Sequence, residues 1–167
     1  EKDPSLRYTI KEKLLEDIQN RTELSKNLEH IDFVFFTGDL TFHGWIEEFD
    51  DVYQELLKPL IEILQITNDR IFIVPGNHEV HLNDVTPPRQ ELREKLLSED
   101  GISLEDIRAV KEKKTLMKSI FRVFDNYNDF VHRYFPHLLS QGKYFNGYFK
   151  QIVELAEQIK IEIIGIN

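Results

Sequence analysis

Two short stretches of the chain decide its fold class. Ile31 to Gly44 reads IDFVFFTGDLTFHG, and Ile71 to Glu79 reads IFIVPGNHE. Each contains a run of β-branched and aromatic residues that is apolar on both faces, as in a buried strand of a parallel sheet. Each run then gives way to a loop rich in glycine and polar residues. Buried strands followed by such loops are typical of an α/β fold.

Helical patterns surround these two strands. Apolar residues recur every four positions from Pro4 to about Leu28, and a second amphipathic helix is predicted at Glu47–Leu64. Pro59 marks a point where the second helix is expected to kink or split. The order helix, strand, helix, strand implies right-handed crossovers and a mostly parallel sheet. A third strand is predicted at 161–166.

The segment after the second loop is predicted to be mainly helical. Helices are expected at Arg89–Leu97, weakly at Leu104 to about Lys114, at Thr115–Phe135 and at Tyr148–Lys160. Aromatic residues gather between Phe121 and Phe149, and we interpret them as helical core or cap rather than as a cage for a ligand. The chain is therefore predicted to be one domain, residues 1–167, with a helical, aromatic-rich insertion at about 83–160.

Composition narrows the classes of function. The chain has 21 Lys and Arg against 30 Asp and Glu, a formal net charge of −9. Such a chain does not attract a long phosphate backbone by itself, but it can bind a small phosphorylated substrate where a cation is present. The absence of cysteine removes disulfides, thiolate zinc sites and cysteine nucleophiles. Because no membrane-spanning run and no signal peptide is visible, we expect a cytoplasmic protein with no membrane partner.

The loops that follow the two strands hold the candidate site, because ligands bind at the C-terminal ends of strands in open α/β sheets. The Asp39 carboxylate can bridge two divalent cations, and Asn77 offers a neutral oxygen ligand. His78 can carry a proton, and Glu79 beside it can orient the imidazole. His43 is a candidate for substrate contact. The alternative is that Asp39 caps a helix and that Pro-Gly-Asn is only a turn, but the two loops together favour a functional site.

These residues resemble the motifs of the calcineurin-like metallophosphoesterases. Gly38-Asp39, with Gly44 five residues later, is similar to the family's G-D-x-x-x-x-G, and Gly76-Asn77-His78-Glu79 is similar to its G-N-H-[D/E]. The resemblance implies a β-sandwich flanked by helices that hydrolyses phosphate esters with two divalent metal ions. Mn, Fe, Zn and Mg all remain open as the metal.

The resemblance also implies a role for each matched residue. Asp39 would bridge the metals and Asn77 would bind the second one. His78 would stabilise the transition state or protonate the leaving oxygen, with Glu79 as its partner. The implied reaction is attack on phosphorus by a metal-activated hydroxide. By analogy with the family, a phosphodiester such as a nucleotide or nucleic acid is favoured over a monoester or a phosphoprotein.

Other motifs of the family are missing from the chain. No D-x-H precedes Asp39, and no G-H-x-H occurs anywhere in the sequence. We interpret this pattern as truncation. The fold is then incomplete at both ends, exposes an apolar face around Phe33 and Phe35, and belongs to a larger multidomain chain, and the isolated piece is expected to be weak or inactive. His132 and His137 are minor candidates for the family's lone histidine ligand, and the main expectation for both is a place on a helix face or in the core.

Two further hypotheses stay open. The chain can be a non-catalytic binding or regulatory domain that keeps the phosphoesterase fold within a larger protein, as the missing ligand motifs suggest. It can also be an unrelated α/β domain whose two loops match by chance. The sequence on either side of the chain discriminates between these hypotheses, because D-x-H before it and G-H-x-H after it would establish the enzyme.

Overall fold

In the computed structural model, the two predicted strands lie side by side. The structure describes residues 4–99, 101–139, 148–156 and 159–166. β1 (Val34–Phe36) and β2 (Ile71–Ile73) are parallel, and Phe35 lies opposite Phe72 in their register. β2 is buried along its whole length, whereas Phe35 in β1 is 56% exposed. The parallel pair confirms the predicted α/β class, and the expected exposure of an apolar face is confirmed at Phe35.

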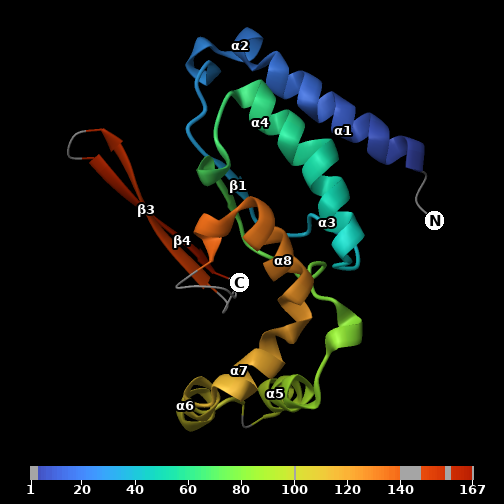
Figure 1. Cartoon of the computed structure of the whole chain (residues 1–167), viewed down its shortest axis with the longest axis vertical. Helices are drawn as coiled ribbons and strands as arrows, with labels where there is room; N and C mark the ends of the chain where they lie inside the picture. Colours follow the sequence, from blue (N-terminus) through green and yellow to red (C-terminus); the bar gives the residue numbers. More distant parts are fainter. Residues whose placement is uncertain (1–3, 100, 140–147, 157–158, 167) are drawn as a thin grey trace.

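Helices cover this small sheet and extend beyond it. They are α1 (Pro4–Gln19), α2 (Arg21–Leu24), α3 (Ile46–Val52), α4 (Lys58–Leu64), α5 (Pro87–Leu97), α6 (Leu104–Glu112), α7 (Lys114–Phe121) and α8 (Asp125–Tyr134). Short 3₁₀ turns are η1 (Lys26–Leu28), η3 (Asn68–Arg70), η4 (Leu82–Asp84), η5 (Arg122–Phe124) and η6 (Pro136–Leu138). In Figure 1, α1 packs beside α4, α8 crosses the centre of the molecule, and α5, α6 and α7 form the end farthest from α1.

The predicted break at Pro59 takes the form of a wider helical turn. A π-helical turn, η2 (Tyr53–Leu57), connects α3 to α4. A proline ring would clash with the carbonyl four residues earlier, which here belongs to Glu55, and proline has no N–H to donate to it. The wider turn accommodates both effects, so α3, η2 and α4 remain one continuous helical segment.

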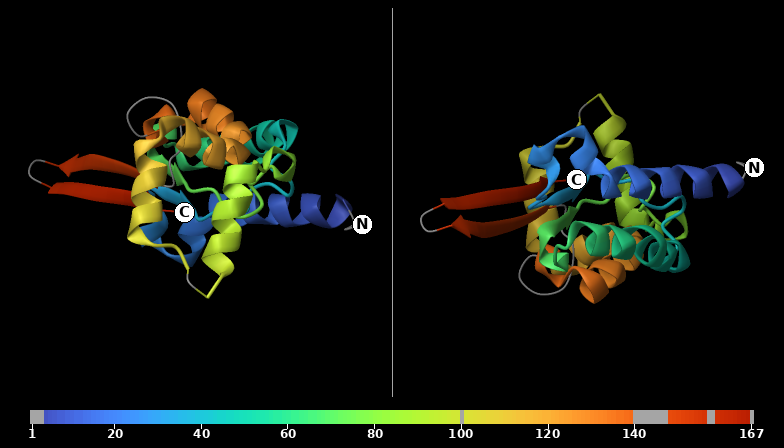
Figure 2. Two further views of the ribbon diagram at one scale, coloured as in Figure 1. Left: turned by 90° about the horizontal axis from the view of Figure 1, so that it is seen from below. Right: turned by 90° about the horizontal axis from the view of Figure 1, so that it is seen from above.

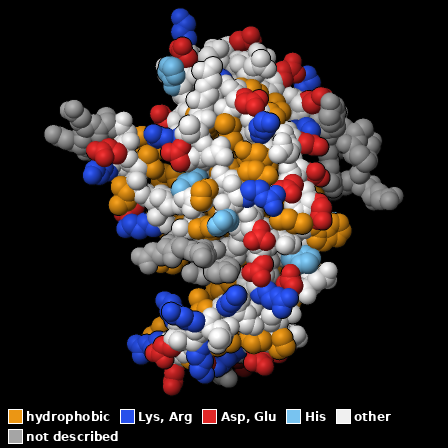
Figure 3. Space-filling view, viewed as in Figure 1, with side chains coloured by type: hydrophobic (Ala, Val, Ile, Leu, Met, Phe, Trp, Pro, Cys, Tyr) orange, Lys and Arg blue, Asp and Glu red, His pale blue; other side chains and the backbone are white. Residues whose placement is uncertain are grey.

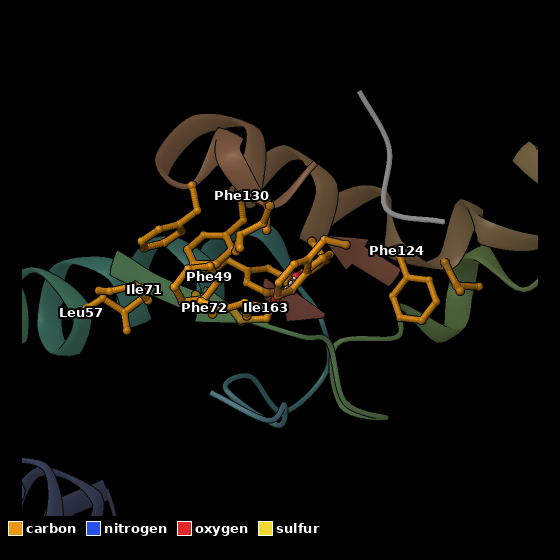
Figure 4. Close-up of a cluster of buried hydrophobic side chains, with 14 residues drawn as sticks. Phe49, Leu57, Ile71, Phe72, Phe124, Phe130 and Ile163 are labelled. Carbon is orange, nitrogen blue, oxygen red and sulfur yellow. Dashed lines mark hydrogen bonds between the residues drawn. The ribbon is translucent and has the colours of Figure 1, made fainter. Parts of the chain in front are cut away.

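The core lies where α3 and α8 pack against β2 (Figure 4). The ring of Phe49 in α3 stacks on that of Phe130 in α8, with 5.0 Å between centroids. The hydroxyl of Tyr127 donates to the carbonyl of Ile73 at 2.8 Å. Burial, with a smaller contribution from the charge of Glu79, raises the pKa of the Tyr127 phenol far above its ordinary value. The aromatic residues of α8 are thus core, as the sequence indicates.

The prediction of a helix at Tyr148–Lys160 is wrong. β3 (Tyr148–Ala156) and β4 (Ile159–Ile166) pair as an antiparallel hairpin. The third strand predicted at 161–166 is present inside β4, but among the described residues it pairs with β3 and not with the sheet of β1 and β2. In short apolar runs, periodicity cannot separate strand from helix. Here Phe149 and Ile152 are spaced by three residues, as on one face of a helix.

The hairpin extends to one side of the molecule, and α1 extends to the opposite side (Figure 2). Its outer residues are apolar and open to solvent: Ile152 is 62% exposed and Ile164 is 54% exposed. Residues 140–147 of the predicted insertion lie outside the described residues, and the insertion's boundaries at about 83–160 stay a prediction. Among the described residues, no helix combines the length and the apolar character that crossing a bilayer requires.

Candidate functional site

One buried carboxylate joins the loop that follows β1 to the loop that follows β2. Glu79 is 1% exposed. Its Oε2 accepts hydrogen bonds from the backbone N–H groups of Asp39 at 2.7 Å and Gly76 at 2.6 Å. Its Oε1 accepts from the N–H of Thr41 at 2.8 Å and from the Thr41 hydroxyl at 3.1 Å. Hydrogen bonds to a charged acceptor are stronger than neutral ones, so these contacts hold the two loops in one arrangement.

Glycine is required where the loops touch. Gly38 has a φ of +109°, and a Cβ there would lie 2.6 Å from the Cα of Gly76. A Cβ on Gly76 would lie 2.2 Å from Oδ1 of Asp39. Both separations are shorter than a carbon atom tolerates, so the loops can approach this closely only without side chains at these positions.

The Asp39 carboxylate lies directly against the second loop. Asp39 has a φ of +59°, a left-handed conformation that is uncommon for a residue with a side chain. Its Oδ1 accepts a hydrogen bond from the backbone N–H of His78 at 3.3 Å. Asn77, the residue before His78, is exposed on the same loop. The two predicted oxygen donors, Asp39 and Asn77, therefore come from adjoining loops at one edge of the sheet.

The partner of His78 differs from the predicted one. Nδ1 of His78 lies 2.9 Å from the carbonyl oxygen of Phe42. Because a carbonyl only accepts, Nδ1 carries the proton of the neutral ring and Nε2 is the nitrogen left for chemistry. The expected pairing of Glu79 with the His78 ring is wrong. Oε1 of Glu79 accepts from Thr41, and Oε2 accepts from the backbone N–H groups of Asp39 and Gly76. His78 is exposed and Glu79 is buried, so the neighbours in sequence belong to different environments.

His43 sits at the outer side of the first loop. Its Nδ1 lies 3.0 Å from Oε1 of Glu48, and its ring stacks on Trp45 with 4.4 Å between centroids. Burial acts to raise the pKa of Glu48. The hydrogen bonds from the His43 ring and from backbone N–H groups of the loop outweigh this effect, so the pKa of Glu48 lies below its ordinary value. The exposed ring of His43 is held in place, and its contact with a substrate stays a prediction.

A cavity of about 880 Å³ opens beside the two loops and extends to α5. His43, Asn77 and His78 line it, which places three predicted site residues on one concave surface. Arg89 and Arg93 line it from α5 and were not identified in the sequence analysis. Their spacing of four residues, which puts both on one face of a helix, is the signal that could have found them.

The donors for a metal are only partly present. Within the part of the chain that the structure describes, no group of three or more His, Asp or Glu residues is placed to hold a metal ion. Asp39 and Asn77 offer the oxygen atoms that divalent cations prefer, but an octahedral ion needs about six ligands. The donor types therefore fit a divalent metal, and the described residues would supply a fraction of its coordination.

Neither of the two minor histidine candidates changes this result. Nε2 of His137 lies 2.9 Å from the carbonyl oxygen of Ile71 and donates to it. Burial lowers the pKa of His137, which is half-buried against the core. His132 is exposed on α8. His137 therefore acts as a core residue and His132 lies on a helix face, as the sequence analysis expects.

Comparisons with known proteins point to one family. A family model described as calcineurin-like phosphoesterase matches residues 8–160. An uncharacterised metallophosphoesterase-like protein of Bacillus subtilis (strain 168), YydB, is 27% identical over 143 residues, which cover 82% of this chain. The chain spans only 28% of the length of YydB. No solved structure gives a significant match.

Proposed function

The chain belongs to the calcineurin-like phosphoesterase family, and on that premise we propose that the full-length protein hydrolyses phosphodiesters with two divalent metal ions. Members of this family are metal-dependent phosphoesterases. We propose four points beyond family membership. The substrate is a phosphodiester, the metal ions are two, the protein is cytoplasmic, and the chain is part of a larger protein.

The clamp formed by Glu79 is the observation that carries the proposal. It holds Asp39 and the Asn77–His78 pair at one edge of the sheet through four hydrogen bonds. Asp39 would contribute negative charge to the metal centre, and Asn77 would contribute a neutral oxygen. When bound, divalent cations neutralise charge on phosphate oxygens and lower the pKa of water. The other ligands would come from outside the described residues.

The remaining residues have separate tasks in this proposal. His78, held through Nδ1 by the carbonyl of Phe42, would carry a proton on Nε2 and donate it to the leaving oxygen. Glu79 would act as a positioning residue, because its oxygens hold the loops and do not face the His78 ring. His43 would contact the substrate from the outer side of the first loop.

The test uses the full-length protein with Mn²⁺ and bis(p-nitrophenyl) phosphate. Asp39→Asn should lose most of the activity and part of the bound metal, because the anionic ligand becomes neutral. His78→Ala should keep its metal and lose about 10²- to 10⁴-fold in turnover, the usual contribution of a general acid. Asp129→Asn, an exposed aspartate on α8, is the matched control and should leave both unchanged. Equal metal loss in Asp39→Asn and His78→Ala would contradict the assigned roles.

The non-catalytic alternative rests on the small number of donors that the described residues bring together. It predicts a full-length protein that binds no metal and shows no turnover in the same assay. For the 167-residue chain by itself, we expect weak Mn²⁺ binding and little hydrolysis, because water would supply nearly all the ligands. Strong turnover by that chain would show that further residues within it complete the centre.

A further inference from the structure

The cavity beside the two loops differs in charge from the chain as a whole. The chain carries 30 acidic against 21 basic residues. Among the described residues that line the cavity there is no Asp or Glu, whereas Arg89, Arg93 and three histidines, at 43, 78 and 81, line it. A concave surface lined by two arginines and by no carboxylate suits an anionic ligand. Figure 3 shows other Lys and Arg side chains of the α5–α7 end mixed with acidic ones.

The two arginines of α5 are held differently. One guanidinium nitrogen of Arg89 donates to the carbonyl of Ile120 at 3.0 Å, and the guanidinium lies 5.6 Å from the ring centroid of Phe124. Arg89 is therefore anchored to the core. Arg93, one helical turn further on, is exposed and forms no ion pair with any residue that the structure describes. Its planar fork of donors is available for a phosphate group.

Two exposed aromatic rings line the same cavity as the two arginines. Trp45 is 48% exposed and Phe42 is 42% exposed, and both line the cavity. Exposed aromatic rings beside cationic groups bind nucleic-acid bases by stacking, which adds about 1–3 kcal/mol per base. The cavity thus combines groups for a phosphate with surface for a base.

The cavity is continuous with the proposed reaction centre, because Asn77 and His78 line it. We propose that it binds the part of the substrate beyond the scissile phosphate: a base on Trp45 and Phe42 and a second phosphate on Arg93. The substrate class is then a short oligonucleotide with a terminal phosphate. This inference rests on the proposed function, since it takes the scissile phosphate to lie at Asp39 and Asn77.

Trp45 is the single tryptophan of the chain, so its fluorescence reports binding in this cavity. The probes are the thymidine dinucleotides TpT and pTpT, which share one phosphodiester and differ by a terminal phosphate. In buffer with EDTA, we expect pTpT to bind at least about tenfold more tightly than TpT. A gain of this size is what one charge-assisted bidentate contact between Arg93 and the terminal phosphate would provide. Arg93→Gln should remove the preference. Arg108→Gln, an exposed arginine on α6 outside the cavity, makes the same charge change and should keep it.

Equal affinities of the unmodified chain for TpT and pTpT would overturn the inference. So would an equal loss of preference in Arg93→Gln and Arg108→Gln, since that result means general charge attraction rather than a site. Neither outcome bears on the proposed function, because bis(p-nitrophenyl) phosphate carries no second phosphate and its hydrolysis is measured with metal. If the full-length protein does not hydrolyse bis(p-nitrophenyl) phosphate but the preference for pTpT is intact, the proposed catalysis is wrong and the binding site stands.

Discussion

The two motif loops and the β3–β4 hairpin are held to the protein by opposite means. In the loops, a carboxylate that is 1% exposed accepts four hydrogen bonds, and glycines let the backbones touch. In the hairpin, apolar residues such as Ile152 and Ile166 are 62% and 71% exposed. Its attachment to the core comes from Phe149 and Ile163, which both belong to the buried cluster. The ring of Phe149 lies 6.1 Å from that of Phe72 and directly over Gly165.

This difference shows two routes from sequence to structure. The loops are specified by residue types with few alternatives: glycine at a positive φ, and a carboxylate among backbone donors. The hairpin is attached by apolar side chains, Phe149 and Ile163, that pack into a core assembled from distant residues. We therefore expect polar and backbone changes to be most costly in the loops and packing changes to be most costly in the hairpin.

The largest effect is expected for Glu79→Gln. Glutamine has one acceptor oxygen, and its amide N–H groups would face the N–H groups that the carboxylate now accepts from. Unsatisfied buried donors of this kind cost about 1–3 kcal/mol each, so we expect the free energy of unfolding to fall by about 3–5 kcal/mol in urea denaturation. Glu62→Gln, an exposed glutamate on α4, is the control and should change stability by less than about 0.5 kcal/mol. Similar losses in both variants would show that the Glu79 carboxylate holds the loops no more firmly than a surface glutamate does.

The second effect separates crowding from backbone strain. Gly38 and Gly101 both have positive φ, +109° and +64°, but a Cβ on Gly101 meets nothing within 4 Å. Gly101→Ala should therefore cost only about 1–2 kcal/mol of strain. Gly38→Ala adds a collision with the backbone of Gly76 and should lower the free energy of unfolding by about 3 kcal/mol or more. Equal losses of unfolding free energy in the two variants would mean that crowding between the loops adds nothing to the cost of Gly38→Ala.

The third effect tests the attachment of the hairpin. A Cβ on Gly165 would lie 2.2 Å from the ring of Phe149 and 2.7 Å from Cγ1 of Val74. Gly165→Ala should displace the ring, lower the free energy of unfolding by about 1–3 kcal/mol, and speed hydrogen exchange of β3 and β4 amides. Ile164→Thr, the exposed neighbour, should leave exchange near its original rate. Unchanged protection in Gly165→Ala would show that Phe149 does not hold the hairpin.

The smallest effect concerns a local polar contact on the surface. The pKa of Asp106 is lowered to about 2, first by a hydrogen bond from Lys95 and then by hydrogen bonds from Ser103, the residue that caps the start of α6. A lowered pKa stabilises the fold above the ordinary value of 3.8, and this contribution is lost as the pH falls through about 2. NMR titration should give an apparent pKa near 2, and Lys95→Met should move it upward. An unchanged value in Lys95→Met would show that Ser103 alone sets it.

Residue type and spacing are enough to predict the elements whose chemistry is local. The buried run at 71–73, the metal-donor candidates Asp39 and Asn77, and the position of the helical break before Pro59 all follow from residue type and spacing. A proline must disturb a helix wherever it lies, and a strand that is apolar on both faces must be covered. These properties do not depend on what the rest of the chain does.

The partners of side chains that are neighbours in the sequence depend instead on tertiary packing. Glu79 follows His78, yet it accepts hydrogen bonds from Thr41 and Asp39, because backbone N–H groups of both loops converge on its carboxylate. Arg93 acquires its place in the cavity only because α5 packs beside those loops. The hairpin packs on the core where Phe149 meets Phe72, a contact between residues far apart in the chain that periodicity over a few positions does not encode.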